Sequence, residues 1–202
     1  MDRKQKFAVG LSPVLFLVML GVYQGFARII GSDLGWYAGF LIYWPIFCLI
    51  IPMLLLGRKR IISLFFYKKT KFANLAVAFL PALITAIGAI FIFKNSRELS
   101  FVGQIIWIAM SFGNGIFEEI LWRGVYIDLF PEKKAWGFVW PTIWFSLWHL
   151  APGSLSHNFS PYVLVPGALF FGACWGWGAY KTKSTLWSSS SHTLTGLIQL
   201  FY

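Results

Sequence analysis

The stretch QIIWIAMSFGNGIFEEILWRGVYIDLF, residues 104–130, is apolar enough to cross a bilayer but carries two adjacent glutamates, Glu118 and Glu119. A charged side chain at membrane depth costs roughly 3 kcal/mol even on conservative insertion scales, so such residues persist mainly where they face a protein interior or a water-filled cavity. Arg123 follows Glu119 by four residues, which places the two on one face of a helix. The stretch therefore predicts a membrane helix that contributes to a functional site.

The composition of the whole chain is that of a polytopic membrane protein. Of its 202 residues, 58% are hydrophobic and only 12% are charged, and the mean hydropathy of +0.68 lies far above that of soluble domains. We expect an all-α bundle that forms a single membrane domain, residues 1–202. Apolar runs predict about seven membrane helices, at 7–30, 36–56, 72–93, 101–130, 135–150, 162–180 and 185–202. The fifth and seventh are short enough to be packed within the bundle.

Several other features receive a structural interpretation. The basic N-terminus leads into a long apolar run without a small-residue cleavage site, which favours a retained first helix over a signal peptide. Cys48 and Cys174 lie in apolar surroundings without metal-binding spacing, so we expect them to be packing residues. His157 lies in a Pro/Gly/Ser-rich loop and is expected to be a solvated bystander.

The formal net charge of +10 is explained by membrane topology rather than by nucleic-acid binding. A cytoplasmic N-terminus places most cations on the cytoplasmic side: Arg3, Lys4, Lys6, Lys133, Lys134, Lys181, Lys183 and six between Arg58 and Lys71. The opposite loops carry Lys94 and Arg97. The segment from Arg58 to Lys71 also contains apolar residues, a pattern typical of a helix in the membrane interface. We expect anionic lipid headgroups to be its partners.

Two histidines in later apolar stretches extend the candidate site. If Glu119 pairs with Arg123, Glu118 is free to face a cavity, and the alternative is that Arg123 or protonation neutralises both glutamates. His149 ends the stretch FSLWH, residues 145–149, and His192 follows a run of four serines. A carboxylate and two imidazoles from three helices have the groups needed to activate a water and stabilise an oxyanion, as amide hydrolysis requires.

These residues resemble the ordered signatures of the CPBP group of intramembrane endopeptidases, which includes the CAAX prenyl proteases and many bacterial Abi-type membrane proteins. The first signature, two glutamates with an arginine four after the second, matches EEILWRG at 118–124. The second, a phenylalanine four before a histidine, matches Phe145 and His149. The third is a histidine followed four residues later by asparagine or aspartate, whereas here His192 is followed by Gly196. The resemblance covers about residues 103–196.

The resemblance implies an intramembrane endopeptidase that cleaves a membrane-embedded or lipidated protein or peptide, in the membrane of a prokaryotic cell. It implies that Glu118 and His149 activate water, that His192 and a partner hold the oxyanion, and that Arg123 anchors Glu119. Candidates to replace the amide missing at position 196 are Ser188, Thr195 and Asn114.

Other interpretations remain open at the level of the sequence. No cofactor is expected, but Glu118, His149 and His192 match the ligand count of a catalytic zinc site, although without the His-x-x-x-His pair typical of zinc peptidases. A non-catalytic membrane scaffold or immunity protein of the same fold is a second function class, favoured by Gly196. A proton-coupled transporter, with the buried carboxylates and imidazoles as a relay, is a third.

Overall fold

The computed structural model of the chain describes residues 1–91, 99–155 and 160–201. Helices make up 87% of it, and the described ranges contain no strand. Five helical segments are long and apolar enough to cross a membrane: Arg3–Ile30, Ser32–Leu56, Phe72–Phe91, Phe101–Leu129 and Pro161–Thr182. The predicted all-α membrane bundle is confirmed. The count of seven crossings stays a prediction, because the expected fifth and seventh helices are not among these five.

Individual elements follow the expected spans closely, and several spans contain wider, π-helical turns, labelled η. In chain order the elements are α1 (Arg3–Ile30), α2 (Ser32–Ile42), η1 (Tyr43–Ile50), α3 (Ile51–Leu56), α4 (Arg58–Ser63), α5 (Phe72–Phe91), α6 (Phe101–Gly113), η2 (Asn114–Glu118), η3 (Ile120–Val125), α7 (Tyr126–Leu129), η4 (Ala135–Val139), α8 (Trp140–Trp148), α9 (Leu150–Gly153), α10 (Pro161–Thr182), α11 (Leu186–Ile198) and the 3-10 turn η5 (Gln199–Phe201). Lys94, Arg97 and His157, interpreted above as loop residues, lie outside the described residues.

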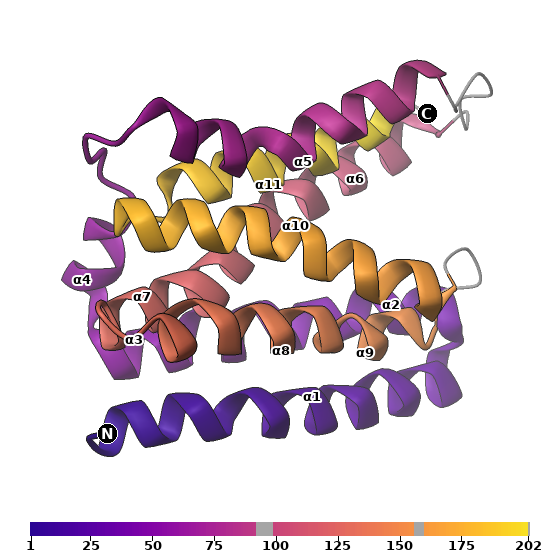
Figure 1. The fold of residues 1–202 in the computed structure, drawn as a ribbon. Coiled ribbons are helices and arrows are strands. Elements are labelled where there is room, and N and C mark those ends of the chain that lie inside the picture. Colours follow the sequence, from indigo (N-terminus) through magenta and orange to yellow (C-terminus); the bar gives the residue numbers. More distant parts are fainter. Residues whose placement is uncertain (92–98, 156–159, 202) are drawn as a thin grey trace.

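The helices run alongside one another in a layered bundle, with α1 along one side and α5 along the other (Figure 1). Helix α10 lies between them and contacts both α5 and α8, while α11 packs against α5, α6 and η2. The two termini lie at opposite ends of the bundle (Figure 1). The candidate site is built where α8, α10 and α11 meet the η2–η3 turns.

Local sequence explains where the first helices begin and end. The Asp2 carboxylate accepts the Gln5 backbone N–H at 2.8 Å, and the Gln5 side chain accepts the Asp2 N–H in return, so a capping box starts α1. Gly31 and Gly57 adopt φ values of +83° and +81°, which L-residues with a Cβ rarely reach. They separate α1 from α2 and α3 from α4.

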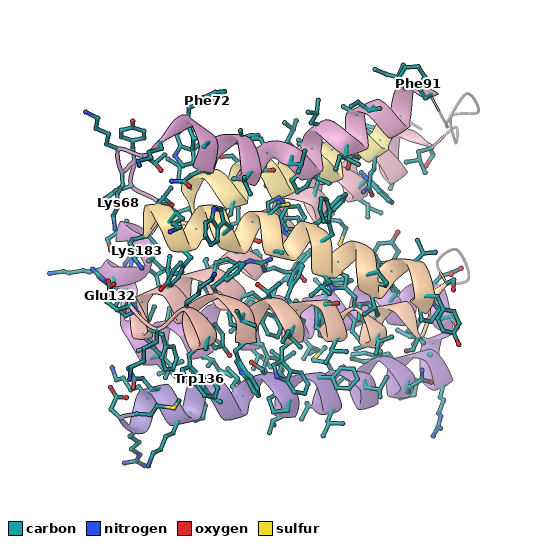
Figure 2. The ribbon with its side chains drawn as sticks, viewed as in Figure 1. Lys68, Phe72, Phe91, Glu132, Trp136 and Lys183 are labelled. Carbon is teal, nitrogen blue, oxygen red and sulfur yellow. The ribbon has the colours of Figure 1, made fainter. Side chains whose placement is uncertain are left out.

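The segment from Arg58 to Lys71 differs from the expected interfacial helix. Only Arg58–Ser63 is helical, because the Leu64 carbonyl is taken by the Thr185 N–H at 2.8 Å and the Ser184 hydroxyl at 2.7 Å. Lys68, Glu132 and Lys183 lie at the same end of the bundle (Figure 2), which is the end that holds the N-terminus (Figure 1). Basic residues that are far apart in sequence therefore gather at one end of the molecule.

Close packing of α11 against α6 and η2 depends on two glycines. A Cβ on Gly115 would lie 2.6 Å from the backbone nitrogen of Thr193 and 2.8 Å from its Cα. A Cβ on Gly196 would lie 2.8 Å from the Ser111 hydroxyl and 3.3 Å from its Cα. Small residues allow such close helix approach in membranes, and here the approach fixes the position of His192.

We expect Gly115→Ala to lower the unfolding free energy by about 2–3 kcal/mol, because the added methyl meets backbone atoms of α11 that cannot move alone. Thermal unfolding in detergent micelles measures the change. Gly88→Ala in α5 is the matched control, since nothing lies within 4 Å of its Cβ position, and it should unfold at or slightly above the wild-type temperature. Equal stability of the two variants would contradict the proposed packing.

Candidate active site

Glu118 and Glu119 lie at a junction of two π-helical segments, η2 and η3. Such widened turns are rare and occur often at functional sites. Both carboxylates are buried, with exposed fractions of 2% and 0%. The sequence placed these residues on a regular α-helix, and the wider turns are a feature that it does not reveal.

The Glu118 carboxylate accepts a hydrogen bond from the side chain of Trp148. Its Oε1 accepts the indole N–H of Trp148 at 3.1 Å, and its Oε2 lies 3.9 Å from Nε2 of His192. The Trp148 ring stacks on Tyr43 with centroids 3.8 Å apart, and the Tyr43 hydroxyl accepts the indole N–H of Trp122 at 2.7 Å. Glu118, which the sequence predicted to be free of Arg123, is thus held by Trp148 through Oε1, and its Oε2 faces His192.

Glu119 forms the predicted pair with Arg123, at 3.4 Å between Oε1 and Nη1. The same Oε1 lies 3.2 Å from Nδ1 of His192, and because an ionised carboxylate only accepts, the imidazole is the donor. Glu119 therefore connects the arginine to the histidine on the neighbouring helix.

The Arg123 guanidinium is also contacted by two other helices, α8 and α10. Nη2 donates to the Gly172 carbonyl of α10 at 3.2 Å, and the guanidinium carbon lies 4.1 Å from the centre of the Phe145 ring. A Cβ on Gly172 would lie 2.7 Å from Phe145 and 3.3 Å from Nη2. Glycine at 172 thus lets α10 approach closely enough to cover the buried charge.

His192 is fixed on its other side by Trp175. The two rings stack at 3.9 Å between centroids with 15° between their planes, and the Trp175 indole N–H donates to the Ser191 hydroxyl at 3.1 Å. Aromatic stacking and the bond to Glu119 together leave the imidazole a single orientation. Its Nε2 consequently faces Glu118.

His149 lies next to this group but forms no hydrogen bond with it within the described part of the chain. Its Nδ1 lies 2.7 Å from the Phe145 carbonyl, so Nδ1 carries the proton and Nε2 keeps an acceptor lone pair. The Phe145 ring contacts both imidazoles, with centroids 4.7 Å from His149 and 6.1 Å from His192. The structure therefore brings Glu118 and His192 within 4 Å, and His149 contacts the same Phe145 ring as His192 does.

Several contributors escaped the sequence analysis, above all the indole groups of Trp148 and Trp175 and the phenol of Tyr43. The available signal was position, since Trp148 directly precedes His149 in the FSLWH stretch. In a chain rich in tryptophan that signal does not separate a carboxylate partner from ordinary packing.

Among residues 1–91, 99–155 and 160–201, no three His, Cys, Asp or Glu side chains are grouped so as to hold a metal ion. The alternative zinc set of Glu118, His149 and His192 is therefore not arranged as a preformed metal site.

A helical membrane bundle with a buried carboxylate, imidazole and guanidinium cluster contributed by several helices defines a polytopic membrane protein with ionisable groups gathered inside the bundle. Residues 99–198, which contain the whole cluster, match the model of the family described as type II CAAX prenyl endopeptidase Rce1-like. The chain belongs to this family of CAAX-type intramembrane proteases and is an integral, multi-pass membrane protein. Searches of the curated proteins and of the solved structures gave no match.

The geometry predicts that removing the charge partner of Glu119 destabilises the protein more than neutralising Glu118 does. Arg123→Met leaves the Glu119 charge buried without its partner and should lower the unfolding free energy by about 3–5 kcal/mol. Glu118→Gln should change it by less than about 1 kcal/mol, because an amide oxygen still accepts the Trp148 N–H. Chemical or thermal unfolding in micelles compares the variants, and a stable Arg123→Met protein would contradict a structural role for the pair.

Proposed function

We propose that the chain is an intramembrane endopeptidase in which Glu118 activates a water for attack on a peptide carbonyl of a membrane-associated protein or peptide. The observation that carries the proposal is the buried approach of Glu118 Oε2 to His192 Nε2, 3.9 Å, with His149 in contact with the Phe145 ring that also contacts His192. Carboxylates and imidazoles in such surroundings are the usual groups of general acid–base catalysis.

Each residue receives a role from its contacts. Glu118, assisted by His149, takes a proton from water as the water oxygen bonds to the carbonyl carbon. His192 faces the developing oxyanion with Nε2, and Glu119 accepts its Nδ1–H, which supports a protonated imidazole as the donor. When the C–N bond breaks, the proton held by Glu118 passes to the leaving nitrogen. Arg123 keeps Glu119 in place and stays outside the chemistry.

The second oxyanion donor is assigned by elimination. Position 196 has no side chain, and a Cβ there would lie 2.8 Å from the Ser111 hydroxyl and 3.0 Å from its Cβ. The Ser188 hydroxyl donates to the Thr185 carbonyl at 3.1 Å, and the Thr195 hydroxyl donates to the Ser191 carbonyl at 2.8 Å. The remaining candidate is Asn114, whose carboxamide N–H₂ group is a donor and whose buried oxygen has no hydrogen-bond partner among the described residues. We assign the donor role to this amide, four residues before Glu118.

We propose a metal-free mechanism, with zinc held by Glu118, His149 and His192 as the alternative. The placement of the donors supports metal-free chemistry, because among the described residues no three His, Cys, Asp or Glu side chains are grouped so as to hold a metal ion.

The proposed topology has seven crossings in one domain, with the N-terminus in the cytoplasm of a prokaryotic cell. It is supported by the location of Lys68 and Lys183 at the end of the bundle where the chain starts (Figures 1 and 2). The segment from Arg58 to Lys71 then contacts anionic headgroups, and the substrate is a membrane-embedded or lipidated protein or peptide.

A second candidate is a non-catalytic membrane scaffold of the same family fold, and Gly196 is the observation that favours it. In that case the charged cluster serves packing alone. A scaffold keeps its function when Glu118 is changed, whereas a protease does not.

We expect Glu118→Gln and His149→Ala each to abolish cleavage, by at least about 100-fold, because each removes a group needed for proton transfer. The assay uses purified protein in liposomes and a quenched fluorescent peptide with a prenylated cysteine near its C-terminus. Tyr162→Phe, at an exposed residue of α10, is the control and should cleave normally. Full cleavage by folded Glu118→Gln would reject the proposed protease mechanism.

Loss of the proposed oxyanion amide in Asn114→Ala should lower kcat by about 100- to 1000-fold with little change in KM, because the donor acts mainly on the transition state. Thr195→Val is the matched control, since the Thr195 hydroxyl is directed to its own helix backbone. Its kcat should stay within a few-fold of wild type. If Thr195→Val loses activity and Asn114→Ala does not, the assignment of the amide is wrong.

A further inference from the structure

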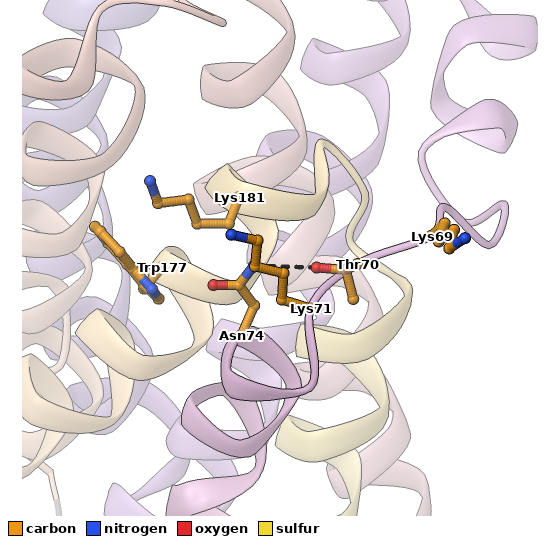
Figure 3. Close-up of a pocket in the computed structure, with 6 residues that line it drawn as sticks. All are labelled: Lys69, Thr70, Lys71, Asn74, Trp177 and Lys181. Atoms are coloured by element: carbon orange, nitrogen blue, oxygen red, sulfur yellow. Dashed lines mark hydrogen bonds between the residues drawn. The ribbon is translucent and has the colours of Figure 1, made fainter.

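A concave surface of about 600 Å³ lies at the basic end of the bundle, where α5 begins and α10 ends. Its lining consists of Lys69, Thr70, Lys71, Asn74, Trp177 and Lys181 (Figure 3). None of the candidate active-site residues lines it, so it is a separate feature of the molecule.

The charge of this concavity is not compensated by the protein. No acidic residue lines it, and none of its three lysines forms an ion pair in the part of the chain that the structure describes. Uncompensated like charges in a concave surface raise the local positive potential and attract anions. A negatively charged ligand removes this repulsion.

The ring of Trp177 forms an aromatic wall that the ammonium groups of two lysines contact. Nζ of Lys181 lies 4.5 Å from the centre of the Trp177 ring, and Nζ of Lys134 lies 5.3 Å from it. Cation–π attraction of this kind restrains flexible lysines near one place. In Figure 3, Lys71, Asn74 and Lys181 lie together beside Trp177, while Lys69 stands apart.

Neutral donors complete the lining. The Asn74 amide donates to the Thr70 hydroxyl oxygen at 3.1 Å, which leaves the Thr70 O–H free to donate to a ligand. Helix α5 starts at Phe72, beside this pair, and a helix N-terminus adds positive partial charge. Two ammonium groups, a hydroxyl and a helix start are the donors that a phosphate group accepts from.

The walls of the concavity are held in place by packing and hydrogen bonding. Nζ of Lys68 donates to the Lys183 carbonyl at 2.7 Å, which ties the chain before α5 to the turn after α10. A Cβ on Gly178 would lie 2.7 Å from Cβ of Ala78, so α5 and α10 are in close contact next to the site. The donors therefore keep a defined relation to one another.

We propose that this concavity binds the phosphate group of an anionic phospholipid. A lipid headgroup is favoured over free phosphate because the site lies at the ends of two apolar spans, α5 and α10, where headgroups gather and tryptophan is enriched. The proposal goes beyond the proposed peptidase activity and holds whether or not the chain cleaves a peptide.

A second basic concavity supplies the internal comparison. It measures about 520 Å³ and is lined by Leu56, Gly57, Arg58, Lys59, Arg60 and Ser63. It lacks an aromatic wall, and Arg60 is already paired with Asp128. If positive charge alone determines lipid binding, both concavities should bind anionic lipid equally. If the aromatic wall and the neutral donors also contribute, the concavity beside Trp177 should bind it more tightly.

The test measures thermal unfolding of the full chain in phosphatidylcholine vesicles as phosphatidylglycerol is added. The double variant Lys71→Gln/Lys181→Gln should require about 30-fold more phosphatidylglycerol for the same stabilisation, since each lysine is removed from the headgroup. Arg58→Gln/Lys59→Gln removes two cations of the same headgroup-facing segment outside the concavity, and this matched comparison should require only a few-fold more phosphatidylglycerol than wild type. All four substituted side chains are exposed, so both variants are expected to fold.

Two further measurements distinguish a lipid headgroup from free inorganic phosphate and from diffuse surface charge. Millimolar inorganic phosphate in pure phosphatidylcholine vesicles should not stabilise the protein, and if it protects as well as phosphatidylglycerol does, the headgroup proposal is overturned. Equal loss of the response in both double variants indicates diffuse surface charge and also overturns it. A Trp177→Leu variant that keeps all lysines should weaken the response several-fold, and an unchanged response there counts against the aromatic wall.

Discussion

The ion pair between Glu119 and Arg123 is the interaction on which the rest of the candidate site depends. Both groups are almost completely inaccessible, and an unpaired charge in such a place costs several kcal/mol. Further contacts to the pair come from other helices: the Gly172 carbonyl of α10, the face of Phe145 on α8 and Nδ1 of His192 on α11. One pair of charges therefore specifies how three helices approach the η2–η3 turns.

This requirement separates two glutamates that are adjacent in sequence. Glu119 is occupied by Arg123 and His192. Glu118 receives the neutral indole N–H of Trp148 and the more distant Nε2 of His192. The first carboxylate is thus paired with a full charge, whereas one oxygen of the second accepts from a neutral donor. This difference supports the proposal that Glu118, rather than Glu119, is the general base.

Sequence patterns predicted the membrane class and the helical spans because hydropathy and length are local properties, and TM-length helices emerged at residues 3–30, 32–56, 72–91, 101–129 and 161–182. The Glu119–Arg123 pair also followed from spacing along one helix. The roles of Trp148 and Trp175 did not, because they depend on how neighbouring helices are rotated and shifted. The helix expected over the segment from Arg58 to Lys71 ends at Ser63, because the turn after α10 donates hydrogen bonds to the backbone carbonyl of Leu64.

The glycine at position 196 follows from the same packing. Helix α11 approaches α6 and η2 so closely at Gly115 and Gly196 that His192 comes within 3.2 Å of Glu119. A Cβ at position 196 would lie 2.8 Å from the Ser111 hydroxyl, so a larger residue there requires Ser111 or α11 to shift. Glycine at 196 and the close approach of α11 are therefore coupled, and the proposed oxyanion donor lies on the other side of this contact, where Asn114 carries an amide four residues before Glu118.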